Sequence, residues 1–480
     1  MSTEISRPLF HLTPRRNWMN DPNGLVHDGA LWHAFFQYNP HGPDWGNMSW
    51  GHATSTDLQH WEEHPVALSH SDGEQIYSGS VVAPSTEEPL VAFYTSAYST
   101  GMQALSRAVS HDGGFSWVAD PDNPVIDRGS TDFRDPKVIR YHGDDGDSRW
   151  ILLAVEAVER RVLFFESRDL RTWAEVGSFG PIGPEGVVWE CPDLLRLHVD
   201  GAPDDARWVL LLSTNAVGDH ADPDGSSMHY LVGDFDGRAF TTDASELTRL
   251  DHGRDLYAGV TFDNAPDDRV IMLGWMSNWR YAHVVPSAPW RGAMSLPRTL
   301  SLRSIGPEVL LVQEPAYFMR AGLAGIEPIE ITEASNRLAL SGHSLVDLRW
   351  EPRLTGVLRI RMQGDADATV ELTHDPRAGT LVLNRLGPAS EAVHPDFAGA
   401  SAAPLRQPWV GRLLLSLDGP LLEVFAGDGA TTMSSLVVLG SGRIQVDVCS
   451  EHPGPLAVRS VDIEADESGA VTAAPAAARA

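Results

Sequence analysis

The chain has 480 residues, and its 36 Lys and Arg against 65 Asp and Glu give a formal net charge of −29 at pH 7. A surface this acidic repels phosphate groups, which argues against binding of nucleic acid or of a membrane surface. Hydrophobic residues make up 42% of the chain, which supports packed cores rather than wholesale disorder, and the length favours two or three domains.

The N-terminus and the cysteines bear on the cellular compartment. The first ten residues hold no basic segment followed by an apolar one, and no apolar run approaches the roughly 18 residues that span a bilayer. Cys191 and Cys449 lie far apart in sequence and cannot build a disulfide framework or a structural zinc site. We therefore expect a cytoplasmic protein with no membrane partner.

A turn sequence, Ser-x-Asp-x-x-x-Trp, recurs along the first half. Copies lie at residues 55–61, 110–117 (one residue longer) and 167–173, with a looser relative at 234–240. The aligned aspartates are 55, 57 and 67 residues apart: Asp57, Asp112, Asp169 and Asp236. A repeat of this length holds the four short strands of a propeller blade. The first 300 residues or so therefore predict a five-bladed β-propeller.

Strand candidates in this half agree with that prediction. They are short, rich in β-branched, aromatic or other apolar residues, and bounded by Gly, Pro, Asp or Asn. They lie at residues 30–38, 81–83, 137–140, 194–198 and 257–262. No long helical period occurs in this half.

The second half has a different pattern. The repeat stops after about residue 302, and residues 306–335, which contain three prolines, are predicted to be a linker. Alternating strands then predict a β-sandwich over residues 336–467: 357–362, 369–373, 380–383, 413–417, 421–425 and 444–448. The Ala-rich end, 468–480, is expected to be a disordered tail. The predicted fold is thus all-β, with a propeller over residues 1–305 followed by a C-terminal β-sandwich.

Five residues at the start of the predicted blades share the period of the repeat. They are separated by 59, 55, 55 and 67 residues: Asp21, Ser80, Asp135, Glu190 and Tyr257. The sequence around Asp21, Asn-Asp-Pro-Asn-Gly, is by itself a common turn sequence, and the other motifs are equally ordinary when taken singly. Residues in register with a propeller repeat, however, meet at its axis. The three carboxylates would repel one another in a dry pocket, so that a protonated acid and an ionised carboxylate coexist. Glycoside hydrolysis requires that pair.

Other features of the sequence agree with a sugar substrate and against a bound cofactor. Of the 15 tryptophans, 13 lie before residue 300. Three of them recur with the repeat and suit blade packing, whereas a surplus offers flat faces for sugar rings: Trp18, Trp45, Trp50, Trp189, Trp275 and Trp279. Motifs for zinc, calcium, nucleotide phosphate and a serine nucleophile are absent, so we expect no metal and no cofactor.

Three motifs resemble the signatures of glycoside hydrolase family 32, the invertases, inulinases and levanases. They are WMNDPNG at residues 18–24, FRDPK at 133–137 and WECPDL at 189–194. Further similar segments cover nearly the whole chain: 36–40, 45–55, 77–80, 274–298 and, in the second domain, 421–429. The resemblance implies the same propeller and sandwich.

The resemblance also implies roles for named residues. Asp21 would be the nucleophile, Glu190 the general acid/base, and Asp135 a stabiliser of the fructosyl hydroxyls and the transition state. The substrate-binding residues would be Asn20, Gln37, Trp45, Ser78, Arg134 and Trp275, with Trp18 and Tyr77 on an aromatic rim. Many members have Trp at the position of Tyr77, so the leaving-group side of the site stays open.

The implied enzyme is a retaining β-fructofuranosidase that releases terminal non-reducing β-D-fructofuranosyl units from sucrose, fructo-oligosaccharides and levan or inulin chains. In a retaining mechanism the two reacting carboxyls lie about 5 to 5.5 Å apart. Two alternatives stay open at this point: a fructosyltransferase with a sugar acceptor, and a non-catalytic sugar-binding propeller. Linkage and chain-length preference also stay open, as does the role of the sandwich in bracing the propeller or forming a homo-oligomer.

Overall fold

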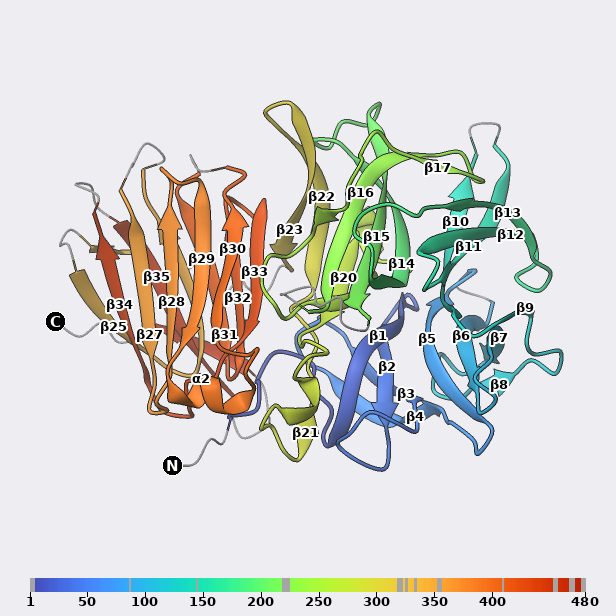
Figure 1. The fold of residues 1–480 in the computed structure, drawn as a ribbon, viewed down its shortest axis with the longest axis horizontal. Helices are drawn as coiled ribbons and strands as arrows, with labels where there is room; N and C mark the ends of the chain where they lie inside the picture. The colour runs from blue at the N-terminus through green and yellow to red at the C-terminus, as the bar shows by residue number, and fades with distance from the viewer. Residues whose placement is uncertain are drawn as a thin grey trace.

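The computed structural model describes residues 5–85, 88–143, 146–217, 225–316, 323, 327–331, 335–351, 356–407, 410–451, 456–465 and 471–475, and every structural statement below concerns these residues. Nearly all the regular structure is β-strand, in seven sheets. Figure 1 shows five small sheets arranged around a common centre and two larger sheets stacked beside them. The predicted all-β fold, a five-bladed propeller followed by a sandwich, is confirmed.

Each blade is an antiparallel sheet that runs outward from its first strand. The first two blades hold β1 (Asn17–His27), β2 (Trp32–Asn39), β3 (Ser49–Ser55) and β4 (Glu62–Leu68), then β5 (Glu74–Val82), β6 (Leu90–Tyr98), β7 (Gln103–Ser110), β8 (Val118–Ala119) and β9 (Ile126–Ser130). The third holds β10 (Phe133–His142), β11 (Ser148–Glu156), β12 (Arg161–Ser167) and β13 (Ala174–Phe179). The fourth holds β14 (Val187–His198), β15 (Ala206–Ala216), β16 (Ser227–Phe235), β17 (Phe240–Thr241) and β18 (Thr248–Arg249), and the fifth β19 (Tyr257–Thr261), β20 (Ile271–Trp275), β22 (Arg298–Ile305) and β23 (Glu308–Pro315).

The first strands of the blades form a closed ring. β1 contacts β5, β5 contacts β10, β10 contacts β14, β14 contacts β19, and β19 returns to contact β1. Between β20 and β22 the chain forms a short 3-10 helix and then β21 (Trp290–Arg291), which pairs in parallel with β1 and joins the last blade to the first. Residues on β1, β5, β10, β14 and β19 therefore meet at the propeller axis.

The repeated turn sequence connects the outer strands of four blades. In the first copy Asp57 Oδ1 accepts hydrogen bonds from the backbone N–H groups of Gln59 (2.9 Å) and His60 (2.8 Å), between β3 and β4. Asp169 binds Arg171 and Thr172 in the same way in the third blade. Such side-chain-capped turns explain why Asp recurs at this place.

The fifth blade lacks that turn, and the predicted end of the propeller at residue 305 is too early. Its outer strands β22 and β23 pair from Ile305 with Glu308, so only Gly306 and Pro307 connect them. The prolines of this segment predict a linker, whereas Pro307 lies in a tight hairpin and Pro315 ends β23. The propeller thus extends to Pro315.

The sandwich consists of a seven-stranded and a six-stranded sheet. The first contains β24 (Ile329–Ile331), β26 (His343–Arg349), β31 (Arg412–Asp418), β32 (Leu421–Ala426), β33 (Thr431–Leu436), β35 (Leu456–Ala465) and β36 (Val471–Pro475). The second contains β25 (Ser335–Leu340), β27 (Leu358–Gln363), β28 (Thr369–Asp375), β29 (Thr380–Leu386), β30 (Gly399–Pro404) and β34 (Ile444–Ser450), and α2 (Pro388–Val393) follows β29. β36 pairs with β35 within the tail predicted to be disordered, and the rest of that tail lies outside the described residues.

Burial patterns show which sandwich strands face the propeller. β27 alternates strictly between buried and exposed residues, as a sheet with one solvated face does. β32 and β33 are buried at every position, because one face meets the sandwich core and the other side lies against the propeller (Figure 1). No helix in the described part of the chain is long and apolar enough to cross a membrane.

Candidate active site

Each inner strand breaks its register with the second strand of its blade at the residues predicted to lie near the axis. The breaks fall between Met19 and Pro22, Tyr77 and Gly79, Arg134 and Lys137, Glu190 and Asp193, and Tyr257 and Val260. A β-bulge leaves a residue unpaired and redirects side chains. Pro136 and Pro192 lie in two of these bulges, where a missing N–H leaves no ladder hydrogen bond unmade. Irregular backbone on five neighbouring strands thus presents polar side chains at the axis.

The second blade differs from the predicted register. Ser80 is predicted to lie at the axis, but its Oγ accepts a hydrogen bond from Val138 N of the third blade at 3.0 Å. The bulge falls instead at Ser78, whose Oγ donates to Asp21 Oδ2 at 2.7 Å. The intervening Gly79 approaches β6 so closely that a Cβ there would lie 2.1 Å from Phe93 O. Ser78, rather than Ser80, is therefore the residue of this blade that contacts Asp21.

Asp21 is buried on β1 and accepts hydrogen bonds at both carboxylate oxygens. Asn20 Nδ2 donates to Oδ1 at 2.9 Å, and Ser78 donates to Oδ2. Burial and the nearby charge of Glu190 raise the pKa of Asp21 from 3.8 to about 6, although these two hydrogen bonds act in the opposite direction. Asp21 is therefore mostly ionised at neutral pH.

Asp135 is buried on the third blade, in a left-handed backbone conformation with φ of 62°. Its Oδ2 accepts a hydrogen bond from Cys191 N at 2.9 Å, and its own N–H donates to Thr95 Oγ1 at 2.8 Å. Burial raises its pKa to about 7, with Arg134 opposing and Glu190 adding to the rise. The protonated form of Asp135 is therefore favoured more than that of an exposed aspartate.

Glu190 has hydrogen-bond donors at both oxygens. Arg134 Nη2 donates to Oε1 at 3.1 Å, and the hydroxyl of Tyr257 donates to Oε2. Burial and the charge of Glu190 raise the pKa of Tyr257 well above 10, so that its hydroxyl stays protonated and remains a donor. Tyr257 is on the axial register of the sequence, yet sequence reasoning gave it no role.

Cys191 joins the three acids and was missed as a site residue. Its Sγ lies 3.8 Å from both Asp21 Oδ2 and Asp135 Oδ2, and it directly follows Glu190 in the chain. Burial and the surrounding carboxylates raise the thiol pKa well above 9, so Cys191 is a neutral weak donor rather than a nucleophile. Its position shows that acids from three blades gather around one point.

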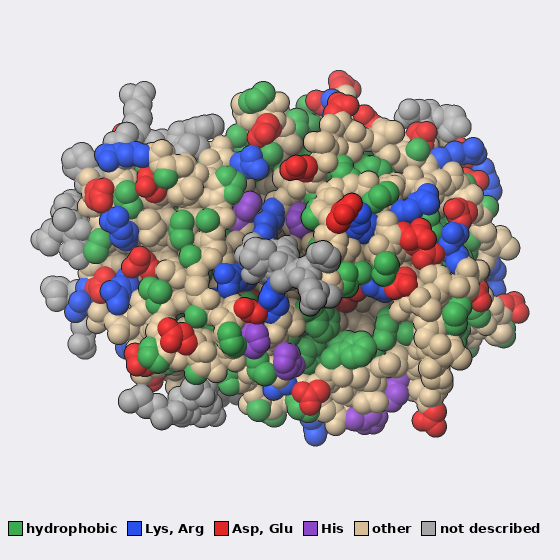
Figure 2. Space-filling view, in the orientation of Figure 1, with side chains coloured by type: hydrophobic (Ala, Val, Ile, Leu, Met, Phe, Trp, Pro, Cys, Tyr) green, Lys and Arg blue, Asp and Glu red, His purple; other side chains and the backbone are tan. Residues whose placement is uncertain are grey.

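Tryptophans form one wall beside the acids. Trp18 donates from Nε1 to Asn20 Oδ1 at 2.7 Å and stacks on Trp279, with ring centroids 5.9 Å apart. Trp275 packs against both. Trp18 and Trp275 are both fully buried, so Trp18 does not lie on the exposed rim where the resemblance places it. Figure 2 shows a hollow in the propeller face with hydrophobic side chains gathered along its edge. Trp279 was noted only among the surplus tryptophans.

The remaining predicted binding residues occupy two different environments. Trp45 is 47% exposed and lies against Tyr77, with ring centroids 5.9 Å apart, as a rim position requires. Gln37 is buried, and its Nε2 donates to Ile76 O at 3.0 Å. Among the described residues no hydrogen bond joins Gln37 to the three acids.

Lys137, the one lysine of the chain, fills the axis next to this site. Its Nζ donates to Thr261 O at 2.6 Å and lies 3.1 Å from Asp193 Oδ2. Asp193 in turn accepts a hydrogen bond from Thr261 N at 2.7 Å. These contacts join the third, fourth and fifth blades and occupy the axial space with buried side chains.

Comparisons with known proteins agree with this architecture. Residues 11–315 match the glycosyl hydrolases family 32 N-terminal domain, and residues 330–451 match the family's C-terminal domain. A levanase of Bacillus subtilis is 37% identical over 94% of this chain and 70% of its own length. An extracellular exo-inulinase of Aspergillus awamori is 33% identical over 92% of this chain and 91% of its own.

Solved structures show the same relationship. The crystal structure of the Aspergillus awamori exo-inulinase covers 98% of this chain and 99% of its own, with a TM-score of 0.86 at 30% identity. A β-fructofuranosidase from Schwanniomyces occidentalis, complexed with fructosyl-erythritol, gives a TM-score of 0.83 at 29% identity over 95% and 98% of the two chains. A propeller with carboxylates gathered at its axis and an attached sandwich defines the protein as a glycoside hydrolase. With both domains matched, the chain belongs to glycosyl hydrolase family 32.

Proposed function

We propose that this protein is a retaining, exo-acting β-fructofuranosidase that releases terminal β-D-fructofuranosyl units from sucrose, fructo-oligosaccharides and levan or inulin chains. The observation that carries the proposal is the meeting of Asp21, Asp135 and Glu190 around Cys191, in a family whose relatives include a levanase and exo-inulinases. Burial raises the pKa values of Asp21 and Asp135, and Glu190 beside them has its own donors in Arg134 and Tyr257. The acids therefore lie in different environments, as glycoside hydrolysis needs.

In this proposal Asp21 attacks the anomeric carbon of the fructosyl unit. Its pKa of about 6 leaves it ionised at neutral pH, and Asn20 and Ser78 fix the orientation of both oxygens. The result is a covalent fructosyl–Asp21 ester with the leaving oxygen displaced.

Glu190 donates the proton that the leaving oxygen takes up, and then removes a proton from the incoming water. Proton transfer turns Glu190 into a carboxylate, which Arg134 and Tyr257 stabilise through their hydrogen bonds. Asp135 binds the fructosyl hydroxyls: its ionised form accepts hydrogen bonds from them, and its protonated form, which burial favours, can also donate one.

Release of terminal units agrees with the shape of the axis. The axial space next to the acids is occupied by Lys137, Asp193 and Thr261. A fructan chain therefore cannot pass through the ring of blades. A non-reducing end that enters the hollow from the open side stops at Asp21. The aromatic pair Trp45 and Tyr77 lies at the rim, where the next sugar unit would contact it.

The test is replacement of Glu190 by Gln, with sucrose and levan as substrates. Loss of proton transfer predicts a fall in kcat/KM of about 10²- to 10⁴-fold. Glu185→Gln, which changes an exposed residue five positions earlier, is the matched control and retains wild-type rates. Near-normal turnover by Glu190→Gln contradicts the proposed role.

Product analysis separates hydrolysis from the alternatives. If water is the acceptor, fructose and glucose form from sucrose in equal amounts even at high sucrose concentration, and the first-formed fructose retains the β configuration. A fructosyltransferase forms less free fructose than glucose. A sugar-binding protein without activity forms neither.

Two further proposals concern the cell. We propose a cytoplasmic location. The described cysteines, Cys191 and Cys449, form no disulfide, which supports this proposal. Cell fractionation tests it against the extracellular location named for several relatives. A homo-oligomer formed through the sandwich stays a prediction. Sedimentation velocity tests it by measuring the oligomeric state in solution.

A further inference from the structure

A short segment of the propeller pairs with the edge of the sandwich. Strand β33 is the edge of its sheet, and residues 250–255, between β18 and β19, lie along it. His252 N donates to Thr432 O at 2.9 Å, and Asp255 N donates to Ser434 O at 3.1 Å. We call residues 250–255 the interface segment. It satisfies carbonyl groups that an edge strand otherwise leaves open.

Two aspartates of the interface segment accept the opposing N–H groups of β33. Asp251 Oδ1 accepts from Ser434 N at 2.8 Å, and Asp255 Oδ2 accepts from Leu436 N at 2.8 Å. Both aspartates are almost fully buried. Gly253 lies between them, so near to β33 that a Cβ would be 1.9 Å from Ser434 O. The contact is therefore tight along the whole segment.

Arg385 of β29 fixes the end of the segment from the sandwich side. Its Nη1 donates to Asp255 Oδ2 at 2.8 Å and to Leu436 O at 3.1 Å, and its Nη2 donates to Tyr281 OH at 3.2 Å. Tyr281 OH donates in turn to Asp255 Oδ1 at 2.7 Å. Arg385 is buried, and its guanidinium lies 4.2 Å from the centre of the Phe397 ring. Both oxygens of Asp255 are thus held.

Only one residue separates Asp255 from Tyr257. The intervening Leu256 is buried, and Tyr257 begins β19 and donates its hydroxyl hydrogen bond to Glu190. A shift of Asp255 therefore moves the residue that holds Glu190. Arg254, the residue before Asp255, is also tied, since its carbonyl accepts a hydrogen bond from Asn278 Nδ2 at 2.7 Å.

We infer that Asp255 and Arg385 are positioning residues for Glu190, and that the sandwich thereby sets the geometry of proton transfer in the propeller. This inference rests on the acid/base role of Glu190 proposed above. Asp255 and Arg385 touch neither the three acids nor the hollow in the contacts described; they act through Tyr257. The sandwich is then part of the catalytic apparatus as well as a brace.

The test compares two fructosides that differ in their need for a proton. Sucrose has a poor leaving group that must be protonated, whereas the nitrophenolate of 4-nitrophenyl β-D-fructofuranoside leaves unaided. The ratio kcat/KM reports fructosylation of the enzyme for both. Asp255→Asn is expected to lower kcat/KM on sucrose by about 100-fold and on the nitrophenyl fructoside by less than about threefold, the loss that a misplaced catalytic group produces.

Three further variants guard against simple misfolding. Gly253→Ala displaces the interface segment without removing a charge. It is expected to give the same split between substrates, that is, a larger loss of kcat/KM on sucrose than on the nitrophenyl fructoside. Arg385→Lys keeps the cation and is expected to retain more sucrose activity than Arg385→Met. The matched control is Asp347→Asn, which removes a buried carboxylate that binds Arg349 and Arg412 within the sandwich. It is expected to lower stability without any split.

Glu190→Gln separates the failure of this inference from failure of the proposed function. If Glu190→Gln shows the split and Asp255→Asn and Gly253→Ala do not, the positioning role is wrong while the function stands. If Glu190→Gln shows no split, the acid/base role on which the inference rests is itself wrong. A split in Asp347→Asn equal to that in Asp255→Asn also overturns the inference.

Discussion

Two clusters of carboxylates in this molecule, all buried except the partly exposed Glu190, behave in opposite ways. The axial cluster is Asp21, Asp135 and Glu190, and the interface cluster, between propeller and sandwich, is Asp251, Asp418 and Glu423. At the axis burial raises the pKa of Asp21 to about 6 and of Asp135 to about 7. At the interface burial acts in the same direction but is outweighed, and the pKa of all three carboxyls is lowered.

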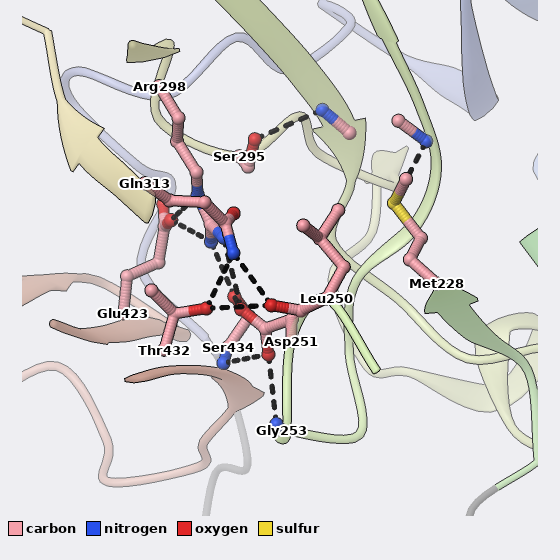
Figure 3. Close-up of polar contacts among 12 residues, drawn as sticks. Met228, Leu250, Asp251, Gly253, Ser295, Arg298, Gln313, Glu423, Thr432 and Ser434 are labelled. Carbon is pink, nitrogen blue, oxygen red and sulfur yellow. Dashed lines mark hydrogen bonds and ion pairs between the residues drawn. The ribbon is translucent and has the colours of Figure 1, made fainter. Parts of the chain in front are cut away.

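The difference lies in the cations. Arg298 is fully buried between Asp251 (3.0 Å from Nη1) and Glu423, to which both Nε and Nη2 donate, and Figure 3 shows it among these residues with Gln313 and Ser434 beside it. His11 binds both Asp418 and Glu423. Among the described residues, the axial cluster has one ion-pair partner, Arg134, which lies 3.1 Å from Glu190 and 3.9 Å from Asp135 and forms no ion pair with Asp21.

Carboxylates inside the molecule thus serve two purposes. A buried carboxylate with its own cation and further donors holds domains together, whereas the raised pKa values of Asp21 and Asp135 favour their protonated forms, so that these groups can exchange protons. Burying the ionised forms of Asp21 and Asp135 at the axis costs free energy of folding, and the proposed chemistry requires this cost. Each of the following predictions tests one side of this contrast.

Replacement of Asp21 by Asn should have the largest effect on activity. Loss of the nucleophile is expected to lower kcat on sucrose on the order of 10⁴-fold or more. The same variant should be more stable than the wild type, because a folded-state pKa raised from 3.8 to about 6 means that ionisation opposes folding.

The pH dependence of the stability gain in Asp21→Asn tests whether the charge of Asp21 is its cause. The gain should be absent below pH 3.8, grow as the pH rises, and reach up to about 3 kcal/mol above pH 6, measured by urea unfolding. An inactive Asp21→Asn variant with the same stability gain at pH 4 and pH 8 would show that charge at the axis is not the source.

Replacement of Arg298 by Met should have the largest effect on stability. It leaves Asp251 and Glu423 buried without their shared cation, a change that costs about 3–5 kcal/mol. The free energy of unfolding and the melting temperature measure the loss. Arg337→Met is the control: its partner Asp447 lies at the surface, where such a pair contributes about 0–1 kcal/mol. Equal losses in the two variants contradict the contrast drawn above.

The axial cluster was more predictable from sequence than the interface cluster. Asp21, Asp135 and Glu190 share the period of the blades, so their positions predict a meeting point. Arg298 and Glu423 are 125 residues apart in the chain and lie in different domains, the propeller and the sandwich. No sequence repeat relates their positions. Tyr257 lies on the axial register and Cys191 directly follows Glu190, but their roles depend on which way a bulge turns each side chain.

The strands show the same limit. Predicted strands at 81–83, 137–140 and 194–198 are the C-terminal parts of β5, β10 and β14, which begin at Glu74, Phe133 and Val187. Their N-terminal parts carry Ser, Asp, Glu and Pro in bulges and therefore lack the apolar alternation of a strand. The sequence pattern fails where the strands carry the site.

The interface cluster should also respond to alkaline pH through His11. Its two carboxylate partners raise the pKa of His11 to about 9 even though burial opposes this. The resulting stability is fully present below pH 6.5 and is lost as the pH rises through 9. Wild type should lose up to about 3 kcal/mol of unfolding free energy over this range, and His11→Gln should lose little of it. His60→Gln, at an exposed pair with Asp57, should follow the wild type.

The smallest expected effect is at the rim of the hollow, away from both clusters. Trp45 is 47% exposed and packs only on Tyr77 in the ring contacts described, so its removal should leave folding intact. Loss of one aromatic sugar contact of about 0.5–1.5 kcal/mol predicts that Trp45→Ala raises KM for fructo-oligosaccharides by about two- to tenfold and leaves kcat unchanged. Trp18→Ala, in the wall that holds Asn20, is the informative comparison and should lower kcat as well. If Trp45→Ala lowers kcat as strongly as Trp18→Ala does, the rim belongs to the reacting centre, and proton and charge placement at the axis are not the only requirements for turnover.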